Sequence, residues 1–159
     1  ETQEKFDVIL SDLPSPIESG HAYQLYTVEF YKILKSKLNA DGIFVLQAGA
    51  GNLLQIELHA KLFRTLSAVF PMVRSYSAFV PSFDVPWSFL ICSLKNNRDP
   101  LLLSAKEIDK RIKQRIRGNL KFYDGMTHEG LFKNPKYIRD VLKNEKEMIT
   151  LKKPVYFYK

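Results

Sequence analysis

Two short apolar runs separated by one helical segment constrain the fold of this chain most. Residues 6–10 (Phe-Asp-Val-Ile-Leu) and 43–46 (Ile-Phe-Val-Leu) are bounded by polar or turn-forming residues, which is typical of buried parallel strands. Between them Thr27 suits the N-cap of a helix over residues 27–38, where apolar side chains recur at helical spacing. Strand, helix and strand in this order predict a crossover unit of the α/β class.

The next segments extend the same sheet. Residues 52–70 carry Leu54, Leu58, Leu62, Leu66 and Val69 at intervals of three and four, which predicts an amphipathic helix that ends at Pro71. Residues 73–80 and 87–94 are rich in strand-forming side chains, and a short loop with two prolines joins them. We therefore expect an antiparallel hairpin at the end of the sheet, and four strands in all.

The C-terminal third is expected to be helical and basic. Ser104 suits the N-cap of a helix over residues 105–116, and a further helix is expected near 135–146. Residues 106–121 hold seven Lys or Arg against two acids, whereas residues 1–31 hold six acids against one lysine. A solvated helix face explains the basic segment most simply, with an RNA-binding patch as an alternative.

Composition and residue spacing exclude several classes of protein. No apolar stretch approaches the roughly 20 residues that span a bilayer, and no signal-peptide pattern opens the chain, so we expect a cytoplasmic protein of one domain over residues 1–159. The single cysteine, Cys92, lies in an apolar run and predicts a buried, inert thiol. His21, His59 and His128 lie far apart, so we expect ordinary surface or helix histidines and no metal site.

The loop after the first strand is the strongest candidate for a functional site. Ligands of open α/β sheets collect at the carboxyl ends of the strands. Asp12 follows the first strand directly, in a loop that Pro14 and Pro16 stiffen, so its carboxylate can be aimed at a substrate. The alternative is that Asp12 only closes a turn.

Six segments occur in a distinctive order: residues 6–16, 25–31, 41–49, 70–76, 80–83 and 87–93. Together they resemble the polyamine aminopropyltransferases, the spermidine and thermospermine synthase family. The resemblance runs from about Phe6 to Pro135, and residues 80–83 are more similar to the thermospermine branch. It implies the C-terminal part of a Rossmann-like, class I methyltransferase-type domain, with two parallel strands, an antiparallel hairpin and flanking helices.

The resemblance also implies a reaction. Family members transfer an aminopropyl group from decarboxylated S-adenosylmethionine, a co-substrate rather than a bound cofactor, to an amine such as putrescine or spermidine, and release methylthioadenosine. An alkylammonium with a pKa near 10.4 must lose a proton before it attacks. Asp12 is the predicted general base. The expected partners are these small molecules and further copies of the protein, with no membrane and no nucleic acid.

The remaining site residues are likewise implied by the resemblance. The family's second loop carboxylate is replaced here by Ser15, which removes a charge from amine binding, and Glu18 is a candidate substitute. Phe83 stands where the spermidine branch has a tyrosine, and Trp87 is expected in the core. The implied acceptor site is Asp12, Leu13, Pro14, Ser15, Glu18, Gln47 and Phe83, with Leu13 and Ser19 as contacts of decarboxylated S-adenosylmethionine.

Several parts of the family pattern are absent from this sequence. Family members place a glycine-rich nucleotide loop, a ribose-binding acid and a β-rich portion before the strand that opens this chain. We therefore expect an enzyme in the full-length protein and no activity in this chain alone. A noncatalytic regulatory homologue, suggested by Ser15, and a basic RNA-binding module remain the alternative functions.

Overall fold

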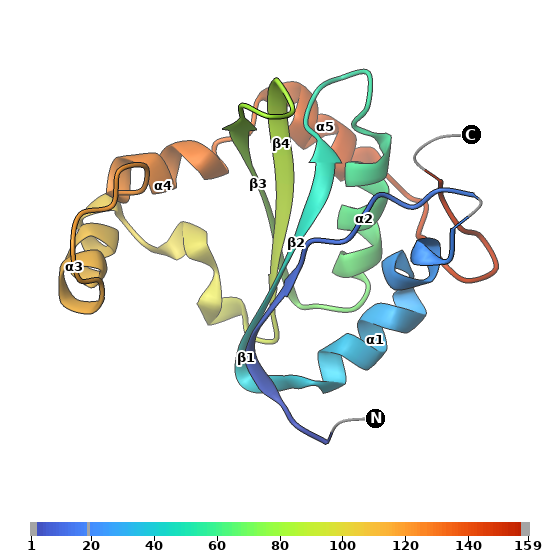
Figure 1. Cartoon of the computed structure of the whole chain (residues 1–159), viewed down its shortest axis with the longest axis horizontal. Coiled ribbons are helices and arrows are strands. Elements are labelled where there is room, and N and C mark those ends of the chain that lie inside the picture. Colours follow the sequence, from blue (N-terminus) through green and yellow to red (C-terminus); the bar gives the residue numbers. More distant parts are fainter. Residues whose placement is uncertain (1–2, 19, 157–159) are drawn as a thin grey trace.

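The computed structural model describes residues 3–18 and 20–156. Its centre is a four-stranded sheet in the order β1-β2-β4-β3 (Figure 1). β1 and β2 pair in parallel, whereas β4 is antiparallel to both β2 and β3. The predicted α/β class, the parallel pair and the hairpin are confirmed. The strands are β1 (Phe6–Ser11), β2 (Leu38–Ala50), β3 (Met72–Val80) and β4 (Val85–Ser93).

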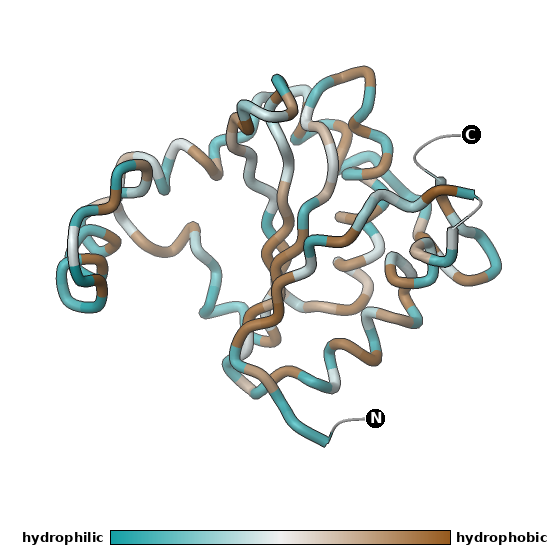
Figure 2. Tube along the Cα trace, in the orientation of Figure 1, coloured by the Kyte–Doolittle hydropathy of each residue, from teal (hydrophilic) through white to brown (hydrophobic). Residues whose placement is uncertain are grey.

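Helices α1 (Val28–Ser36) and α2 (Glu57–Ser67) lie on one side of the sheet (Figure 1). The strand side chains that point toward them are almost completely buried and form the main core. Figure 2 shows that the central strands consist largely of apolar residues. Helix α5 (Lys136–Asn144) packs on α2 through a second apolar cluster. The main core includes Tyr31, Phe44, Leu46, Leu62, Leu66, Leu90 and Cys92.

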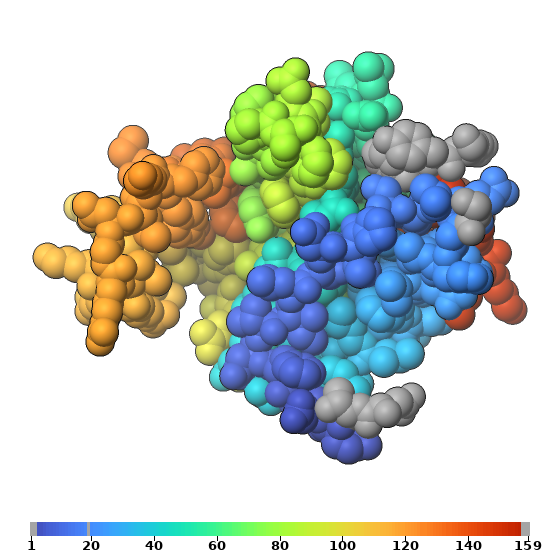
Figure 3. Space-filling view, in the orientation of Figure 1, coloured from blue at the N-terminus to red at the C-terminus, as the bar shows by residue number. Residues whose placement is uncertain are grey.

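The opposite face of the sheet is exposed at β1. Val8 is 57% and Leu10 is 73% exposed, although both are apolar. Val45, which pairs with Leu10, is only half-buried, and Figure 3 shows the atoms of β1 on the visible surface in blue. The prediction that residues 6–10 form a buried strand is therefore wrong, because β1 is the edge strand of the described sheet and neither α1 nor α2 covers this face.

Helices α3 (Ala105–Arg115) and α4 (Gly125–Phe132) lie beside the sheet, on the side away from α1 (Figure 1). The backbone N–H of Ala105 donates to Glu129 Oε1 at 3.1 Å, and the N–H of Gly125 donates to Asp109 Oδ1 at 2.7 Å. Each helix thus caps the other. A Cβ at Gly125 would lie 2.1 Å from the carbonyl oxygen of Ala105, so only glycine permits this contact. Helix α4 was not predicted.

The local signals for helix ends explain both the correct and the incorrect boundaries. Thr27 and Ser104 accept hydrogen bonds from the third backbone N–H that follows, as predicted for N-caps. Helix α2 begins at Glu57 rather than at 52, because the Asn52 side chain accepts from the next backbone N–H groups and forms a turn. Three short 3₁₀ helices complete the fold: Ala22–Tyr26, Asn96–Arg98 and Pro100–Leu102.

None of the helices in the described part of the chain has the length and apolar composition needed to cross a lipid bilayer.

Candidate active site

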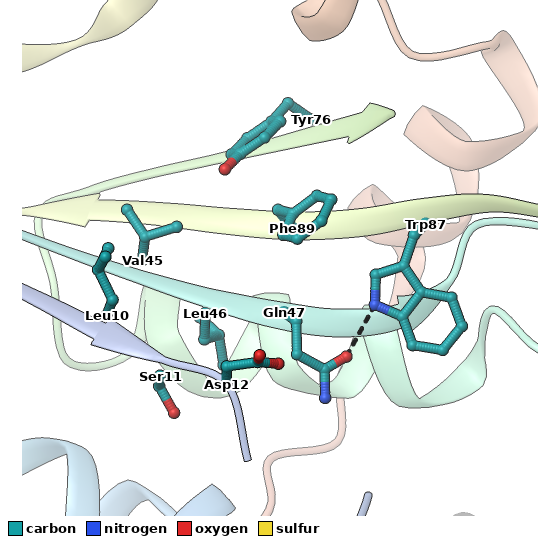
Figure 4. Close-up of a pocket in the computed structure, with 9 residues that line it drawn as sticks. All are labelled: Leu10, Ser11, Asp12, Val45, Leu46, Gln47, Tyr76, Trp87 and Phe89. Carbon is teal, nitrogen blue, oxygen red and sulfur yellow. Dashed lines mark hydrogen bonds between the residues drawn. The ribbon is translucent and has the colours of Figure 1, made fainter. Parts of the chain in front are cut away.

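Two polar side chains lie where β1 ends beside the last residues of β2. Asp12 directly follows β1, and Gln47 lies near the end of β2. Both line a pocket of about 340 Å³ (Figure 4). The other lining residues are Ser11 and six apolar or aromatic residues: Leu10, Val45, Leu46, Tyr76, Trp87 and Phe89.

The carboxylate of Asp12 is exposed, and in Figure 4 it extends from the end of β1 toward Gln47. An exposed carboxylate beside apolar walls can hold an ammonium group while the walls contact the hydrocarbon part of the same molecule. The predicted position of Asp12 at the carboxyl end of a parallel strand is confirmed. Its role as a general base stays a prediction.

The loop that follows Asp12 is held by a buried tyrosine. The hydroxyl of Tyr26 donates to the carbonyl oxygens of Leu13 and Pro14, at 3.2 and 3.0 Å. Burial and then the negative charge of Asp12 raise the pKa of Tyr26 to about 12. The phenol therefore stays protonated at neutral pH and remains a donor to the loop.

Gln47 is also engaged with the loop. Its Nε2 donates to the carbonyl oxygen of Leu13 at 2.8 Å, and its Oε1 accepts from the indole Nε1 of Trp87 at 2.9 Å. Trp87 is half-buried and lines the pocket, so the expectation of a core tryptophan is wrong. The position of Trp87 at the pocket follows from the register of β4 on β2, which pairs Trp87 with Ala50 at the end of β2. No residue pattern near Trp87 in the sequence indicated this register.

Aromatic side chains form the far wall of the pocket. Tyr76 stacks on Phe89 with 5.2 Å between ring centroids, and on its other side contacts Phe132 of α4 at the same distance. Burial, with a further contribution from Tyr123, raises the pKa of Tyr76. The ring is thus fixed, and Figure 4 shows it across the pocket from Asp12.

The structure brings some predicted residues to the pocket and leaves others apart. The carbonyl of Leu13 is hydrogen-bonded to Gln47, which lines the pocket, whereas the carbonyl of Pro14 is bonded only to Tyr26, which does not line it. Phe83 is 52% exposed and contacts the ring of Trp87, with 4.2 Å between centroids. Ser15 is half-buried and Glu18 exposed, and neither lines the pocket. Ser19 lies outside the described residues.

The remaining candidates are structural. Cys92 is fully buried and burial raises its thiol pKa, which confirms the prediction of an inert thiol. His59 and His128 lie in helices α2 and α4, which is one of the two expected alternatives, and both are buried; they contact Ser75 Oγ and the carbonyl of Pro100 respectively. Among residues 3–18 and 20–156, no three His, Cys, Asp or Glu side chains are grouped so as to hold a metal ion.

Comparison with known proteins identifies the family. Residues 1–101 match the spermine/spermidine synthase domain. A polyamine aminopropyltransferase of Sulfolobus acidocaldarius is 43% identical over 155 residues, which cover 98% of this chain and 50% of the relative. The chain therefore spans about half the length of the curated relatives it matches.

Solved structures agree with this relationship. The spermidine synthase of Thermotoga maritima superposes with a TM-score of 0.68 and 26% identity, over 89% of this chain and 45% of that one. A spermidine synthase in complex with the transition-state analogue AdoDATO gives a TM-score of 0.66 and 28% identity, over 89% of this chain and 44% of that one. The chain belongs to the spermine/spermidine synthase family.

Proposed function

We propose that this chain forms the amine-acceptor half of a polyamine aminopropyltransferase of about the relatives' length. The observation that carries the proposal is the position of Asp12, at the end of β1 and in a pocket with apolar and aromatic walls. A polyamine combines ammonium groups with a hydrocarbon chain, so a carboxylate beside such walls complements it. The names of the relatives, polyamine aminopropyltransferase and spermidine synthase, support the same assignment.

In the proposed reaction Asp12 accepts a proton from the acceptor ammonium. A group with a pKa of about 10.4 lies about 3.4 units above neutral pH, so its deprotonation costs about 4.6 kcal/mol. A carboxylate beside the nitrogen takes the proton as the nitrogen attacks, and holds the nitrogen in line. The new C–N bond forms at the methylene next to the sulfonium of decarboxylated S-adenosylmethionine. The C–S bond breaks, and its electron pair leaves with methylthioadenosine.

The remaining acceptor contacts belong to the same proposal. Leu13, Pro14, Ser15 and Glu18 come from the loop that carries Asp12. Phe83 contacts Trp87, whose ring lines the pocket, which supports a place for Phe83 at the acceptor site. We include decarboxylated S-adenosylmethionine as co-substrate and a homo-oligomeric assembly, which derive from the family resemblance. We also include a cytoplasmic location, which derives from the sequence pattern.

The uncovered face of the sheet supports the view that further polypeptide completes the enzyme. Apolar side chains of β1 are exposed, and an apolar hollow of about 440 Å³ runs between β1 and α1. An apolar edge strand of this kind pairs readily with another strand. We propose that the remainder of a protein of the relatives' length covers β1 and supplies most of the nucleoside site. The hollow is lined by Phe6, Val8, Ile9, Leu10, Phe30, Ile33, Leu34 and Lys37.

Product analysis tests the function. The intact protein, incubated with decarboxylated S-adenosylmethionine and putrescine or spermidine, should form the aminopropylated amine and methylthioadenosine in equal amounts. Mass spectrometry quantifies both products. The isolated chain should form neither and should bind the nucleoside weakly in calorimetry. An intact protein that binds the amine but forms no product would instead favour the noncatalytic homologue.

A further inference from the structure

A chain of hydrogen bonds joins the hairpin strand β4 to the loop that carries Asp12. The indole Nε1 of Trp87 donates to Oε1 of Gln47 at 2.9 Å, the contact that Figure 4 draws as a dashed line. The Nε2 of Gln47 then donates to the carbonyl oxygen of Leu13 at 2.8 Å. Three segments that are far apart in sequence are therefore connected through one carboxamide, next to the residue proposed as the base.

The partners of Gln47 fix which way its amide points. An indole N–H only donates and a carbonyl oxygen only accepts, so Oε1 must face Trp87 and Nε2 must face Leu13. The backbone N–H of Gly49 also donates to Oε1, at 3.2 Å. Gly49 adopts a φ of 83°, which turns the backbone just after Gln47. Two donors occupy the two lone pairs of Oε1, so this oxygen has no lone pair left for a substrate ammonium.

Two further contacts show that the loop is held from both sides. The carbonyl oxygen of Leu13 accepts from Tyr26 as well as from Gln47. The carbonyl of Pro14 accepts a second bond from Tyr26, and the ring of Pro14 restricts its own φ. Fixing the peptide that follows Leu13 limits the backbone angles on either side of it. Asp12 therefore lies between two restrained residues, because Ser11 before it pairs with Leu46 of β2 and the carbonyl of Leu13 after it is hydrogen-bonded, and this limits the backbone angles that aim its side chain.

The ring of Trp87 is itself immobilised. It is half-buried, and its contact with Phe83 has a centroid distance of 4.2 Å and an interplanar angle of 35°. A packed indole offers its N–H in one direction at little further cost in conformational entropy. Trp87 is therefore suited to orient Gln47.

We propose that Trp87 and Gln47 are positioning residues that clamp the 12–14 loop and aim the carboxylate of Asp12. Trp87 acts only through Gln47, and Gln47 acts through the carbonyl of Leu13. The consequence for turnover rests on the proposed function, whereas the clamp itself is a property of the loop. The two parts can be measured separately.

The test compares Trp87→Phe and Gln47→Leu in the intact protein. Trp87→Phe removes the N–H but keeps a ring against Phe83. We expect amide hydrogen exchange in peptides covering residues 11–18 to quicken about 5-fold in both variants, the effect of one ordinary hydrogen bond. We expect kcat to fall about 10-fold, because small displacements of a catalytic group are costly. The KM for decarboxylated S-adenosylmethionine should not change.

The double variant gives the decisive comparison. If Trp87 acts through Gln47, then Trp87→Phe should cause no further loss of kcat when Gln47 is already leucine. Tyr137→Phe is the matched control, because it removes a single donor to the carbonyl of Gly51 outside the loop, and it should leave exchange in residues 11–18 and kcat unchanged.

The proposal is overturned if amide exchange in the loop is unchanged in Trp87→Phe. It is also overturned if the fall in kcat of the double variant equals the falls of the two single variants combined. If the wild-type protein transfers no aminopropyl group, the proposed function fails. The exchange measurement then decides alone whether the clamp exists.

Discussion

On the face of the sheet that α1 and α2 cover, Phe44 and Leu90 are fully buried, whereas on the opposite face Val8 and Leu10 are 57% and 73% exposed. Alternate residues of the strands supply both faces, because successive strand side chains point in opposite directions. Both sets are apolar, so both have the composition of an interior. Within the described residues, helices cover the β1 side chains of the first face only, and those of the opposite face are exposed.

The candidate active site belongs to the incomplete face. Gln47, Phe89 and Tyr76 are register partners across three strands, and all three line the pocket with Asp12. The covered face holds the main core, and the open face holds the pocket that Asp12 and Gln47 line.

Truncation in the covered face should have the largest effect. Leu90→Ala removes a side chain that is fully buried between β2, β3 and α2, so it should lower the free energy of unfolding of the chain by about 2–5 kcal/mol. Urea denaturation followed by circular dichroism measures the difference.

Leu10→Ala is the matched control on the open face. The same atoms are removed from a side chain that is 73% exposed, so the loss in the isolated chain should stay within about 0.5 kcal/mol. A loss as large as that of Leu90→Ala would remove the distinction between the two faces. A larger loss in the intact protein than in the isolated chain would support our proposal that further polypeptide covers β1.

Acid should lower the free energy of unfolding through His59, which lies on the covered side of the sheet. This side chain is fully buried and its Nε2 lies 2.9 Å from Ser75 Oγ; burial lowers its pKa to about 4. Since the unfolded chain takes up this proton near pH 6.5, stability should be full above that pH. It should fall by about 3 kcal/mol between pH 6.5 and 4, and not change further below.

The measurement is the unfolding free energy of wild type and His59→Gln as a function of pH. Glutamine keeps a polar partner for Ser75 but does not titrate, so this component of the slope should disappear. An equal slope between pH 6.5 and 4 in both proteins would show that His59 is not its source.

On the open side, restoring a charge at Ser15 should strengthen acceptor binding. Ser15→Asp places a carboxylate in the loop after Asp12, and its attraction for an ammonium should contribute about 1–3 kcal/mol, or about 5- to 150-fold in affinity. Calorimetric titration of putrescine and spermidine into the intact protein with methylthioadenosine measures it.

Ser104→Asp is the matched control for charge. It adds the same group at the N-cap of α3, in the part of the molecule beside the sheet, and should leave amine affinity unchanged. No gain for either amine in Ser15→Asp would favour the noncatalytic homologue over the enzyme.

Much of the covered side could be predicted from the sequence, because its signals are local. The N-cap Thr27, the apolar strands and the hairpin all depend on residues close in sequence, and so does the N-cap Ser104 of α3 beside the sheet. The exposure of β1 could not be predicted from the sequence. An apolar run indicates that a strand is suited to an interior, but it does not indicate which other segments pack against each face of that strand. Helix α4 was missed because two glycines lower its propensity, although the N-cap Asp124 was a visible signal.

The candidate site could be predicted only in part, for a related reason. Asp12 follows from the rule on strand ends, and its pocket was found there. The contact between Trp87 and Gln47 depends on the register of β4 against β2, which residue patterns do not specify. The donation of Tyr26 to the loop depends likewise on where the chain returns after residue 20.

The turnover of Asp12→Asn in the intact protein tests the central claim most directly. Asparagine keeps the size of the side chain but cannot accept the proton of the acceptor ammonium, so kcat should fall at least about 100-fold. Asp84→Asn, an exposed hairpin residue with a φ of 53° that asparagine also adopts, should retain wild-type kcat. Release of methylthioadenosine measures both. Wild-type turnover in a folded Asp12→Asn protein would contradict the account, because the pocket at the end of β1 would then not be where the amine loses its proton.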